Sequence, residues 1–199
     1  MEKSPLQKMN YYVNWLLYAV VGRMQEADGL LEKYQSEIYE FAGVLNRLYP
    51  VALEPLWRGV LVEPTEVVNG KLAPDPRLSF VSFSRDYGVA EWFADTKSIM
   101  SGYVKQIRPS VEGYIASVVP KVDDVLFDAE WARRGMLSTF LSEAANMHPH
   151  IDGEQFCWNV RTQSEVIVKP QDALKVVRYS SKNTKALDEK YCMPQFRSL

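Results

Sequence analysis

The sequence has little cysteine, little histidine and no apolar run long enough to cross a membrane. Among 199 residues there are two cysteines, Cys157 and Cys192, which form neither a CxxC pair nor a disulfide framework and so favour a reducing compartment. The apolar stretch 10–22 is shorter than the roughly 20 residues that a membrane span needs, and it contains Asn14. The charged sequence RMQEADG that follows is a poor signal-peptide cleavage site. We therefore expect a soluble cytoplasmic protein with no membrane partner.

Nucleotide-binding and metal-binding motifs of the common kinds are missing as well. There is no GxGxxG and no P-loop, and neither cysteine has a neighbouring acid or base that would mark it as a nucleophile. The two histidines, His148 and His150, are separated by a proline that splays their side chains, so they indicate a loop and we expect no metal. A net charge of −2 gives no overall attraction to nucleic acid but leaves a local basic groove open.

What is present is an ordinary globular composition, with 47% hydrophobic and 24% charged residues. The length suits one well-buried domain. Apolar residues recur at steps of three and four after Asp28, a plausible N-cap, and Pro50 should end that helix. This helical stripe comprises Leu31, Tyr34, Ile38, Phe41, Leu45 and Leu48. Residues 6–24 should form a more buried partner helix, which makes residues 1–52 a helical pair packed on a core formed by residues 53–199.

The rest of the chain alternates strand and helix patterns, which indicates an α+β fold. The expected strands are 56–62, 78–83, 113–119, 164–168 and 173–179. The expected helices are 85–95 and 129–147. Residues 146–159 look like a loop, and the tail after Ser180 is polar.

Three of these strands carry polar residues at positions where a core would need apolar ones. They hold Arg58 in LWRGV, the pair Ser82 and Ser84 in FVSFS, and Gln163 with Glu165 in TQSEV. Buried charges are rarely left unpaired, so an arginine and a glutamate in such strands indicate either a functional site or an Arg58–Glu165 ion pair that is purely structural.

Together and in this order, the three motifs resemble the mono-ADP-ribosyltransferases of the Arg-Ser-Glu type. In that family a strand with an arginine is followed by a Ser-x-Ser strand and helix, and then by a late strand that begins with Gln/Glu-x-Glu. LWRGV and VSFSRDYGVAEWFA are similar to the phage enzymes that modify host RNA polymerase. The resemblance covers residues 53–179 and implies two small packed antiparallel sheets, with NAD⁺ as co-substrate in the cleft between them. A phage or bacterial effector acting in the host cytoplasm would be the setting.

The resemblance also implies a role for each motif residue. Arg58 would hold the phosphate and ribose side of NAD⁺, since a planar and permanently charged fork suits that task. Gly59 would let the backbone approach the nicotinamide amide. Ser82 would support Glu165, which would bind a ribose hydroxyl and stabilise the developing cation. The NAD⁺-binding set is Arg58, Gly59, Ser82, Phe83 and Ser84.

Gln163 is where the chain departs from the polymerase-modifying enzymes, which have Glu-x-Glu. In the family, Glu at this place accompanies arginine targets, whereas Gln accompanies asparagine side chains or nucleic-acid bases. We therefore expect a host protein or nucleic-acid acceptor that is not an arginine, and expect Gln163→Glu to shift preference toward arginine without stopping NAD⁺ cleavage. Phe156 and Trp158 are either exposed aromatics that press on the target or residues packed under the loop.

Several assignments stay open on the sequence alone. Phe83 and Trp92 are either core residues or stack on nicotinamide, with core favoured for Trp92. Lys97, Lys105 and Arg108 fit a solvated charge run better than a phosphate-contacting loop. The same motifs would serve an NAD⁺ glycohydrolase, and a non-catalytic interaction protein that binds partners through its N-terminal helices is the alternative of another class. Glu165→Ala should abolish either activity and barely change stability, since an exposed acid in a cleft contributes little to folding.

Overall fold

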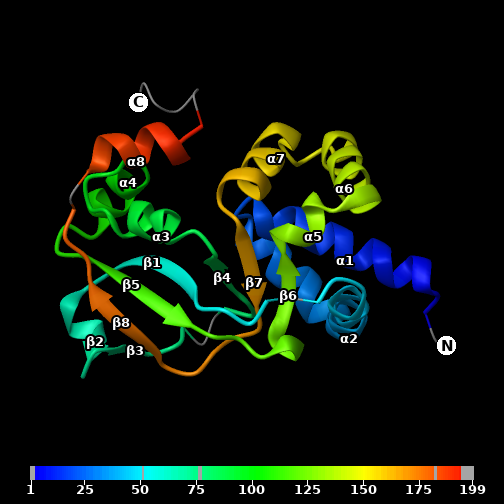
Figure 1. Ribbon diagram of the computed structural model, residues 1–199, viewed down its shortest axis with the longest axis horizontal. Helices are drawn as coiled ribbons and strands as arrows, with labels where there is room; N and C mark the ends of the chain where they lie inside the picture. Colours follow the sequence, from blue (N-terminus) through cyan, green and yellow to red (C-terminus); the bar gives the residue numbers. More distant parts are fainter. Residues whose placement is uncertain (1–2, 51, 76–77, 182, 194–199) are drawn as a thin grey trace.

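The computed structural model describes residues 3–50, 52–75, 78–181 and 183–193. In those residues the fold is α+β, with an antiparallel sheet of eight strands and eight α-helices around it (Figure 1). The strand order is β2-β3-β8-β5-β1-β4-β7-β6. The strands are β1 (Leu56–Val62), β2 (Val67–Val68), β3 (Lys71–Leu72), β4 (Val81–Ser84), β5 (Glu112–Val118), β6 (Val125–Asp128), β7 (Glu165–Val168) and β8 (Leu174–Arg178). The helices are α1 (Pro5–Val20), α2 (Met24–Leu48), α3 (Tyr87–Ala94), α4 (Ile99–Ile107), α5 (Ala129–Arg133), α6 (Gly135–Met147), α7 (Gly153–Thr162) and α8 (Thr184–Tyr191).

The expectation of two packed sheets is wrong in terms of strand pairing, because one hydrogen-bonded sheet contains all eight strands. The central junction is narrow, however: β1 and β4 are joined at the single pair Trp57–Ser84. On one side β1 pairs with β5 along all seven of its residues, and on the other β4 pairs with β7 along all four of its own. Figure 1 shows the two strand groups, β2-β3-β8-β5-β1 and β4-β7-β6, meeting at this junction.

The N-terminal helical pair forms as expected, but its second helix starts earlier than the sequence indicated. Helix α1 begins at a capping box between Ser4 and Gln7, with Pro5 in its first turn. The chain then turns at Gly22, whose φ is 77°, and α2 starts at Met24, so Asp28 lies inside the helix and is not its N-cap. Helix α2 ends before Pro50 as predicted.

The predicted stripe on α2 mostly faces the core. Leu31, Ile38 and Leu45 are buried, and Tyr34 and Phe41 pack against the main cluster, whereas Leu48 is exposed. The ring of Tyr34 stacks on Tyr11 of α1 at a centroid distance of 3.8 Å, at a point where α2 is kinked. The same apolar cluster contains residues of α1, α2, β4, β6 and β7, so the helices and this half of the sheet share one core.

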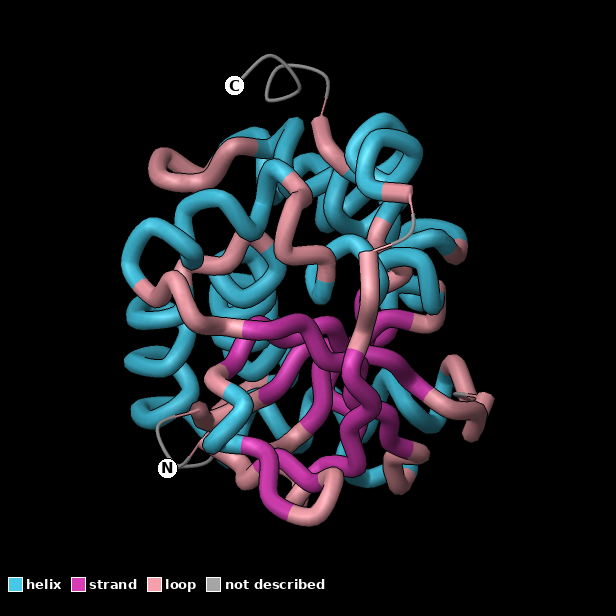
Figure 2. The backbone as a smooth tube through the Cα atoms, turned by 90° about the vertical axis from the view of Figure 1, so that its left-hand side faces the viewer, coloured by secondary structure: helices cyan, strands magenta, loops and turns pink. Residues whose placement is uncertain are grey.

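Other elements differ from the sequence-based expectation in length or type. The expected strand 78–83 is shorter and later, as β4, and the expected helix 129–147 is divided at Arg134 into α5 and α6. The expected loop 146–159 contains most of α7, which begins after its N-cap Asp152, and the polar tail contains α8. Figure 2 shows the helices gathered mainly above the strands in that view. Within the described residues, no helix has the length and apolar character of a membrane span.

Candidate functional site

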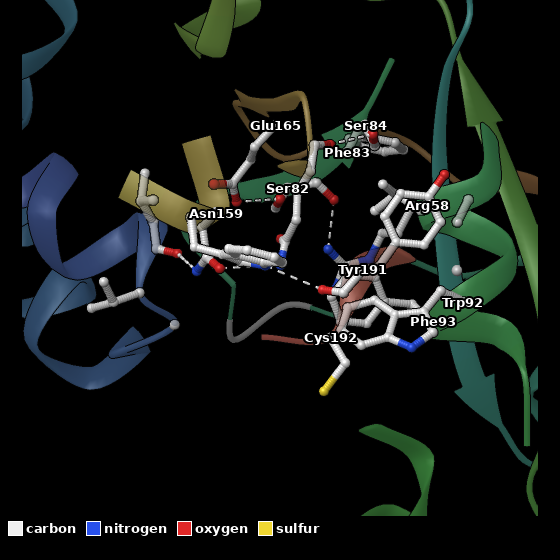
Figure 3. A pocket seen from close by; sticks show the side chains of 18 of the residues that line it. Arg58, Ser82, Phe83, Ser84, Trp92, Phe93, Asn159, Glu165, Tyr191 and Cys192 are labelled. Carbon is white, nitrogen blue, oxygen red and sulfur yellow. Dashed lines mark hydrogen bonds between the residues drawn. The ribbon is translucent and has the colours of Figure 1, made fainter. Parts of the chain in front are cut away.

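A cavity of about 510 Å³ lies where the sheet narrows, and residues from all three sequence motifs line it (Figure 3). Strands β1, β4 and β7 contribute Arg58, Ser82 and Glu165. Helices α3 and α7 and the C-terminal segment around Tyr191 provide much of the remaining wall. A cavity of this size, with a mainly apolar wall and a few convergent polar groups, is typical of a small-molecule site.

Glu165, the first residue of β7, is the most unusual group in the cavity. Its side chain is 6% exposed. Ser82 Oγ donates a hydrogen bond of 2.5 Å to its Oε1, while Oε2 is buried with no hydrogen-bond partner among the described residues. An unsatisfied buried carboxylate oxygen is costly, and such atoms in a cavity mark a place where a ligand can donate a hydrogen bond.

The environment of Glu165 changes its acidity. Burial raises the pKa of its carboxyl from 4.5 to about 7, while the Ser82 hydroxyl and the charge of Arg58 act in the opposite direction. A group whose pKa lies near neutrality exchanges its proton readily in the physiological range, which is common for functional carboxylates and rare for surface ones.

The backbone that aims Glu165 is held in a strained conformation. Ser164 has a φ of 45°, in the left-handed region that a residue with a side chain seldom adopts. Its carbonyl accepts a hydrogen bond from Arg85 N at 3.1 Å, and its hydroxyl accepts one from Arg133 Nη2 at 3.1 Å. Arg133 was not singled out from the sequence, because only the fold brings α5 beside the start of β7.

Arg58 reaches across the junction between β1 and β4. Its Nη1 donates a 2.6 Å hydrogen bond to the backbone carbonyl of Ser82, and burial lowers the pKa of its guanidinium. In the part of the chain that the structure describes, Arg58 and Glu165 form no ion pair, so the purely structural salt bridge is not observed. Instead, Arg58 binds the backbone carbonyl of Ser82 and Glu165 binds its side-chain hydroxyl. Both the guanidinium and the carboxyl group line the cavity.

A hydrogen bond between Ser84 and Gln163 joins β4 to the C-terminal end of α7. Ser84 Oγ donates a short hydrogen bond to the backbone carbonyl of Gln163 and accepts one of 2.9 Å from Asp86 N. Gln163 is the C-cap of α7, and its Nε2 donates to Asn159 Oδ1 at 3.2 Å. Ser84 is therefore a positioning group for the Gln-x-Glu segment, although it also lines the cavity.

Gly59 lies at the cavity, but packing explains why it is a glycine. A Cβ on Gly59 would be 2.0 Å from the carbonyl oxygen of Ala90 and 2.5 Å from the nitrogen of Ala94, both in α3. Gly113 in β5 has the same constraint against Ala94. The expected backbone approach to nicotinamide is thus not needed to account for Gly59, since a side chain there would push α3 off the sheet.

The aromatic residues divide between core and cavity. Phe83 and Trp92 are each 2% exposed and belong to apolar clusters, yet both border the cavity. Phe156 is buried in the main core, so its interpretation as an exposed target-contacting residue is wrong. Trp158 borders the cavity and donates from Nε1 to the backbone carbonyl of Tyr191 at 3.2 Å. The difference arises because 153–162 is a helix, with Phe156 on its core-facing side.

Sequence reasoning missed the contribution of two elements to the site. In α7, Gln155, Asn159 and Gln163 recur at a spacing of four and all line the cavity. Asp152 followed by Gly153 and Glu154 is an N-cap signal that could have revealed this helix. The contribution of α8 had no comparable sequence signal. Its Asp188 accepts a 2.8 Å hydrogen bond from Trp92 Nε1, and Trp92 lies in a distant part of the chain.

The remaining candidate groups lie outside the site. Arg108 forms ion pairs with Glu63 and Glu66, and Lys97 is exposed. The His148 ring packs edge-on against Tyr18. The described residues hold no group of three or more His, Cys, Asp or Glu side chains placed to bind a metal.

Comparisons with known proteins identify no relative. No protein-family model matches the chain, and neither the curated proteins nor the solved structures gave a match.

Proposed function

We propose that this protein is an NAD⁺-dependent mono-ADP-ribosyltransferase that transfers ADP-ribose to a macromolecular acceptor. The observation that carries the proposal is the buried carboxylate of Glu165, with Ser82 bound to one oxygen and the other oxygen unpartnered in a cavity that Arg58 also lines. Arg58 is the one cationic side chain among the described residues that line this cavity. The sequence motifs that resemble the Arg-Ser-Glu transferases are thus the residues that share it.

The reaction suits a site that combines a carboxylate with an arginine. The bond between nicotinamide and C1′ of the ribose breaks, and its electron pair leaves with nicotinamide, which becomes neutral and needs no protonation. Positive charge then develops on the ribose, as in glycoside hydrolysis. The nucleophile of the acceptor forms the new bond at C1′ and loses one proton to solvent or a base.

Each residue has a role in this scheme that its contacts support. Glu165 Oε2 accepts a hydrogen bond from a ribose hydroxyl and stabilises the developing cation, a contribution worth about 3–4 kcal/mol for one such group. Ser82 fixes the rotamer of Glu165 through Oε1. Arg58, held by the Ser82 carbonyl, binds the phosphate or ribose oxygens of the substrate.

Gln163 lies on the side of the cavity formed by α7, where an acceptor would enter. A neutral amide at this position cannot orient and deprotonate a guanidinium as a second carboxylate would. The proposed acceptor is therefore a side chain other than arginine, such as asparagine, or a nucleic-acid base.

The test is to incubate the protein with labelled NAD⁺ and a bacterial lysate, beside Glu165→Gln. Labelling of macromolecules and nicotinamide release should both fall by about 10²–10³-fold in the variant, since a transition-state contact is lost. Glu154→Gln, which changes an exposed carboxylate on α7, is the matched control and should behave as wild type. Label removed by nuclease indicates a nucleic-acid acceptor, and label removed only by protease indicates a protein.

Other outcomes would point to the alternative functions. Rapid nicotinamide release without labelling would identify an NAD⁺ glycohydrolase. NAD⁺ left intact by the wild-type protein in several lysates would contradict the proposal and favour a non-catalytic interaction protein.

A further inference from the structure

We propose that Asn159 is a positioning residue that fixes the side-chain amide of Gln163 with its carbonyl oxygen directed to the acceptor. This inference rests on the proposed function for its consequence, but the hydrogen bonds behind it stand on their own. Asn159 and Gln163 are one helical turn apart, near the end of α7, and both line the cavity (Figure 3 labels Asn159).

The orientation follows from a chain of three groups that starts at a main-chain carbonyl. A backbone carbonyl can only accept, so the Val20 oxygen must face the amino group of Asn159, and Nδ2 lies 2.9 Å from it. The carbonyl oxygen Oδ1 of Asn159 is then directed at Gln163, which has to donate from Nε2, at 3.2 Å. The hydrogen bond of the Gln163 side chain to Asn159 uses Nε2, so Oε1 is left to accept from a ligand in the cavity that Gln163 lines.

We call the hydrogen-bonded series Val20 carbonyl, Asn159 and Gln163 the amide relay, and each of its residues is held in place by further contacts. Asp152 caps α7 by accepting hydrogen bonds from the backbone nitrogens of Glu154 and Gln155. Gln163 N donates to the Asn159 carbonyl at 3.0 Å, and the Gln163 carbonyl accepts from Ser84 in β4. Its main chain is thus tied to the sheet while its side chain is tied through Asn159 to α1. Groups held in this way lose little entropy when a ligand binds.

The relay sets what the acceptor must offer at this place. Because Gln163 presents an oxygen, the acceptor has to donate a hydrogen bond, which the N–H of a carboxamide or exocyclic amino group can do. An acceptor that offers only an oxygen would leave two lone pairs opposed and unsatisfied. In Gln163→Glu, a carboxylate oxygen would meet Asn159 Oδ1. This contact changes the expectation from the sequence: the substitution alone should not give the shift toward arginine, which would need a change at Asn159 as well.

The orientation can be tested without any enzymatic activity, by proton exchange at side-chain amides measured by NMR. The Gln163 NH₂ resonances, assigned by their absence in Gln163→Glu, should exchange about fivefold more slowly than those of Gln155, since one proton is held in a hydrogen bond. Gln155 is the matched control, because it lines the same cavity on the same helix. Equal exchange at Gln155 and Gln163 in the wild-type protein would overturn the proposal.

Two substitutions at Asn159 separate positioning from simple anchoring of α7. Both Asn159→Leu and Asn159→Asp lose the hydrogen bond to the Val20 carbonyl, but an ionised aspartate still accepts from Gln163 Nε2 and preserves its orientation. At pH 8, we expect Asn159→Asp to keep both the slow exchange and the wild-type ratio of transfer to nicotinamide release in the labelled-NAD⁺ assay. Asn159→Leu should lose the slow exchange and lower that ratio about tenfold, while Glu154→Gln, an exposed position on the same helix outside the cavity lining, leaves it unchanged.

The two levels of the hypothesis can fail separately. Equal loss of transfer ratio in Asn159→Asp and Asn159→Leu would mean that Asn159 only anchors α7 to α1, and would refute its positioning role. Intact NAD⁺ with the wild-type protein would refute the proposed function instead. The proton exchange rates of the Gln163 and Gln155 amides would then still test whether Asn159 orients Gln163.

Discussion

At the scale of single residues, burial of Glu165 links its chemistry to the stability of the fold. The carboxyl has a pKa of about 7 in the folded protein, against 4.5 when it is free of these surroundings. Because the folded state disfavours the ionised form, folding is most favourable below pH 4.5 as far as this group is concerned. That contribution is lost as the pH rises to 7 and stays lost above it. The expectation that Glu165 is an exposed acid is wrong, because its side chain is buried, and the small effect on stability that was expected from exposure no longer follows.

This gives a prediction for Glu165→Gln in urea unfolding. At pH 8 the variant should exceed the wild-type free energy of unfolding by about 3 kcal/mol, because it removes the cost of a buried charge. At pH 5, where Glu165 is protonated in the fold, the two proteins should agree within about 1 kcal/mol. A gain that is equal at both pH values would contradict a raised pKa at this residue.

The same group predicts the pH dependence of the reaction. The proposed mechanism uses the carboxylate, so nicotinamide release at subsaturating NAD⁺ should rise about tenfold per pH unit below a pKa near 7 and level off above it. The measurement is the pH profile of kcat/KM for NAD⁺. A flat profile between pH 5 and 8 would show that the ionisation of Glu165 does not control the reaction.

At the scale of elements, the close packing of α3 on β1 decides where the arginine lies. Without a Cβ on Gly59 and Gly113, the backbone of α3 rests directly on the two strands. Arg58 and Gly59 are adjacent in β1. Gly59 allows α3 to pack closely on the strand, and the side chain of Arg58 lines the cavity. Alternation along the strand places these two side-chain positions on opposite faces.

Gly59→Ala should accordingly be severe. A Cβ at 2.0 Å from a backbone oxygen cannot be accommodated unless α3 and β1 separate, and we expect a loss of about 3 kcal/mol or more. The control is Gly29→Ala in α2, where an added Cβ meets nothing within 4 Å. That substitution should stabilise the helix by about 0.5–1 kcal/mol. Thermal unfolding of both variants is the measurement, and similar melting temperatures for the two would refute the packing argument.

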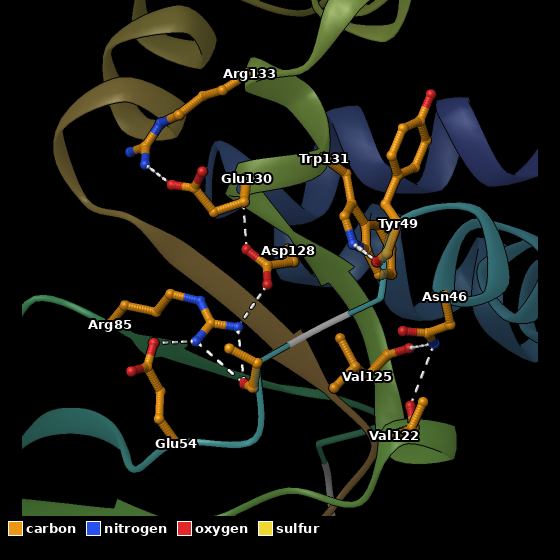
Figure 4. A network of polar contacts seen from close by, with 11 residues as sticks. Asn46, Tyr49, Glu54, Arg85, Val122, Val125, Asp128, Glu130, Trp131 and Arg133 are labelled. Atoms are coloured by element: carbon orange, nitrogen blue, oxygen red, sulfur yellow. Dashed lines mark hydrogen bonds and ion pairs between the residues drawn. The ribbon is translucent and has the colours of Figure 1, made fainter.

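At the scale of the whole molecule, the N-terminal helices are part of the core. Trp15 and Leu16 of α1 and Ile38 of α2 are buried with the strands of the β4-β7-β6 group. Asn46 of α2 donates to the carbonyls of Val122, just before β6, and Val125, the first residue of β6 (Figure 4). Nearby, Trp131 Nε1 donates to the Tyr49 carbonyl, and Arg85 bridges Asp128 and Glu54. The contacts of Asn46 and Trp131 tie the helical pair to β6 and α5, and β6 pairs with β7, the strand that carries Glu165.

A fragment of residues 53–199 should therefore lack a cooperative unfolding transition. Removing the helices exposes the apolar face of β4, β6 and β7 to water. The resulting loss in the free energy of unfolding is far larger than that of any single substitution. The measurement is urea unfolding by circular dichroism, with residues 1–52 added in trans as the control that restores the core. A fragment that unfolds cooperatively with the stability of the whole chain would show that the helices are an appendage.

Local patterns were enough to predict the helical pair, the α+β class, most strands and the three polar motifs. Periodicity and turn residues act over a few positions, so LWRGV and FVSFS could be recognised as strands that carry polar groups. The expectation that the TQSEV segment is already a strand at Gln163 and Ser164 was wrong, because Gln163 caps α7, Ser164 has a positive φ, and β7 begins at Glu165. The start of α2, the helical nature of 153–162 and the presence of α8 could not be placed with the same certainty, because their stabilising contacts lie far away in the sequence.

The sequence by itself determined which groups are available: one arginine, two serines and a glutamate in three short strands, and a glutamine two residues before the last of these strands. Only the tertiary structure decided that Arg58 contacts the Ser82 carbonyl, that Glu165 is buried with one free oxygen, and that Phe156 belongs to the core. It also revealed Asn159, whose role depends on the Val20 carbonyl 139 positions away. Burial and hydrogen-bond direction arise when distant segments meet, and they set the pKa values and orientations that a chemical site requires.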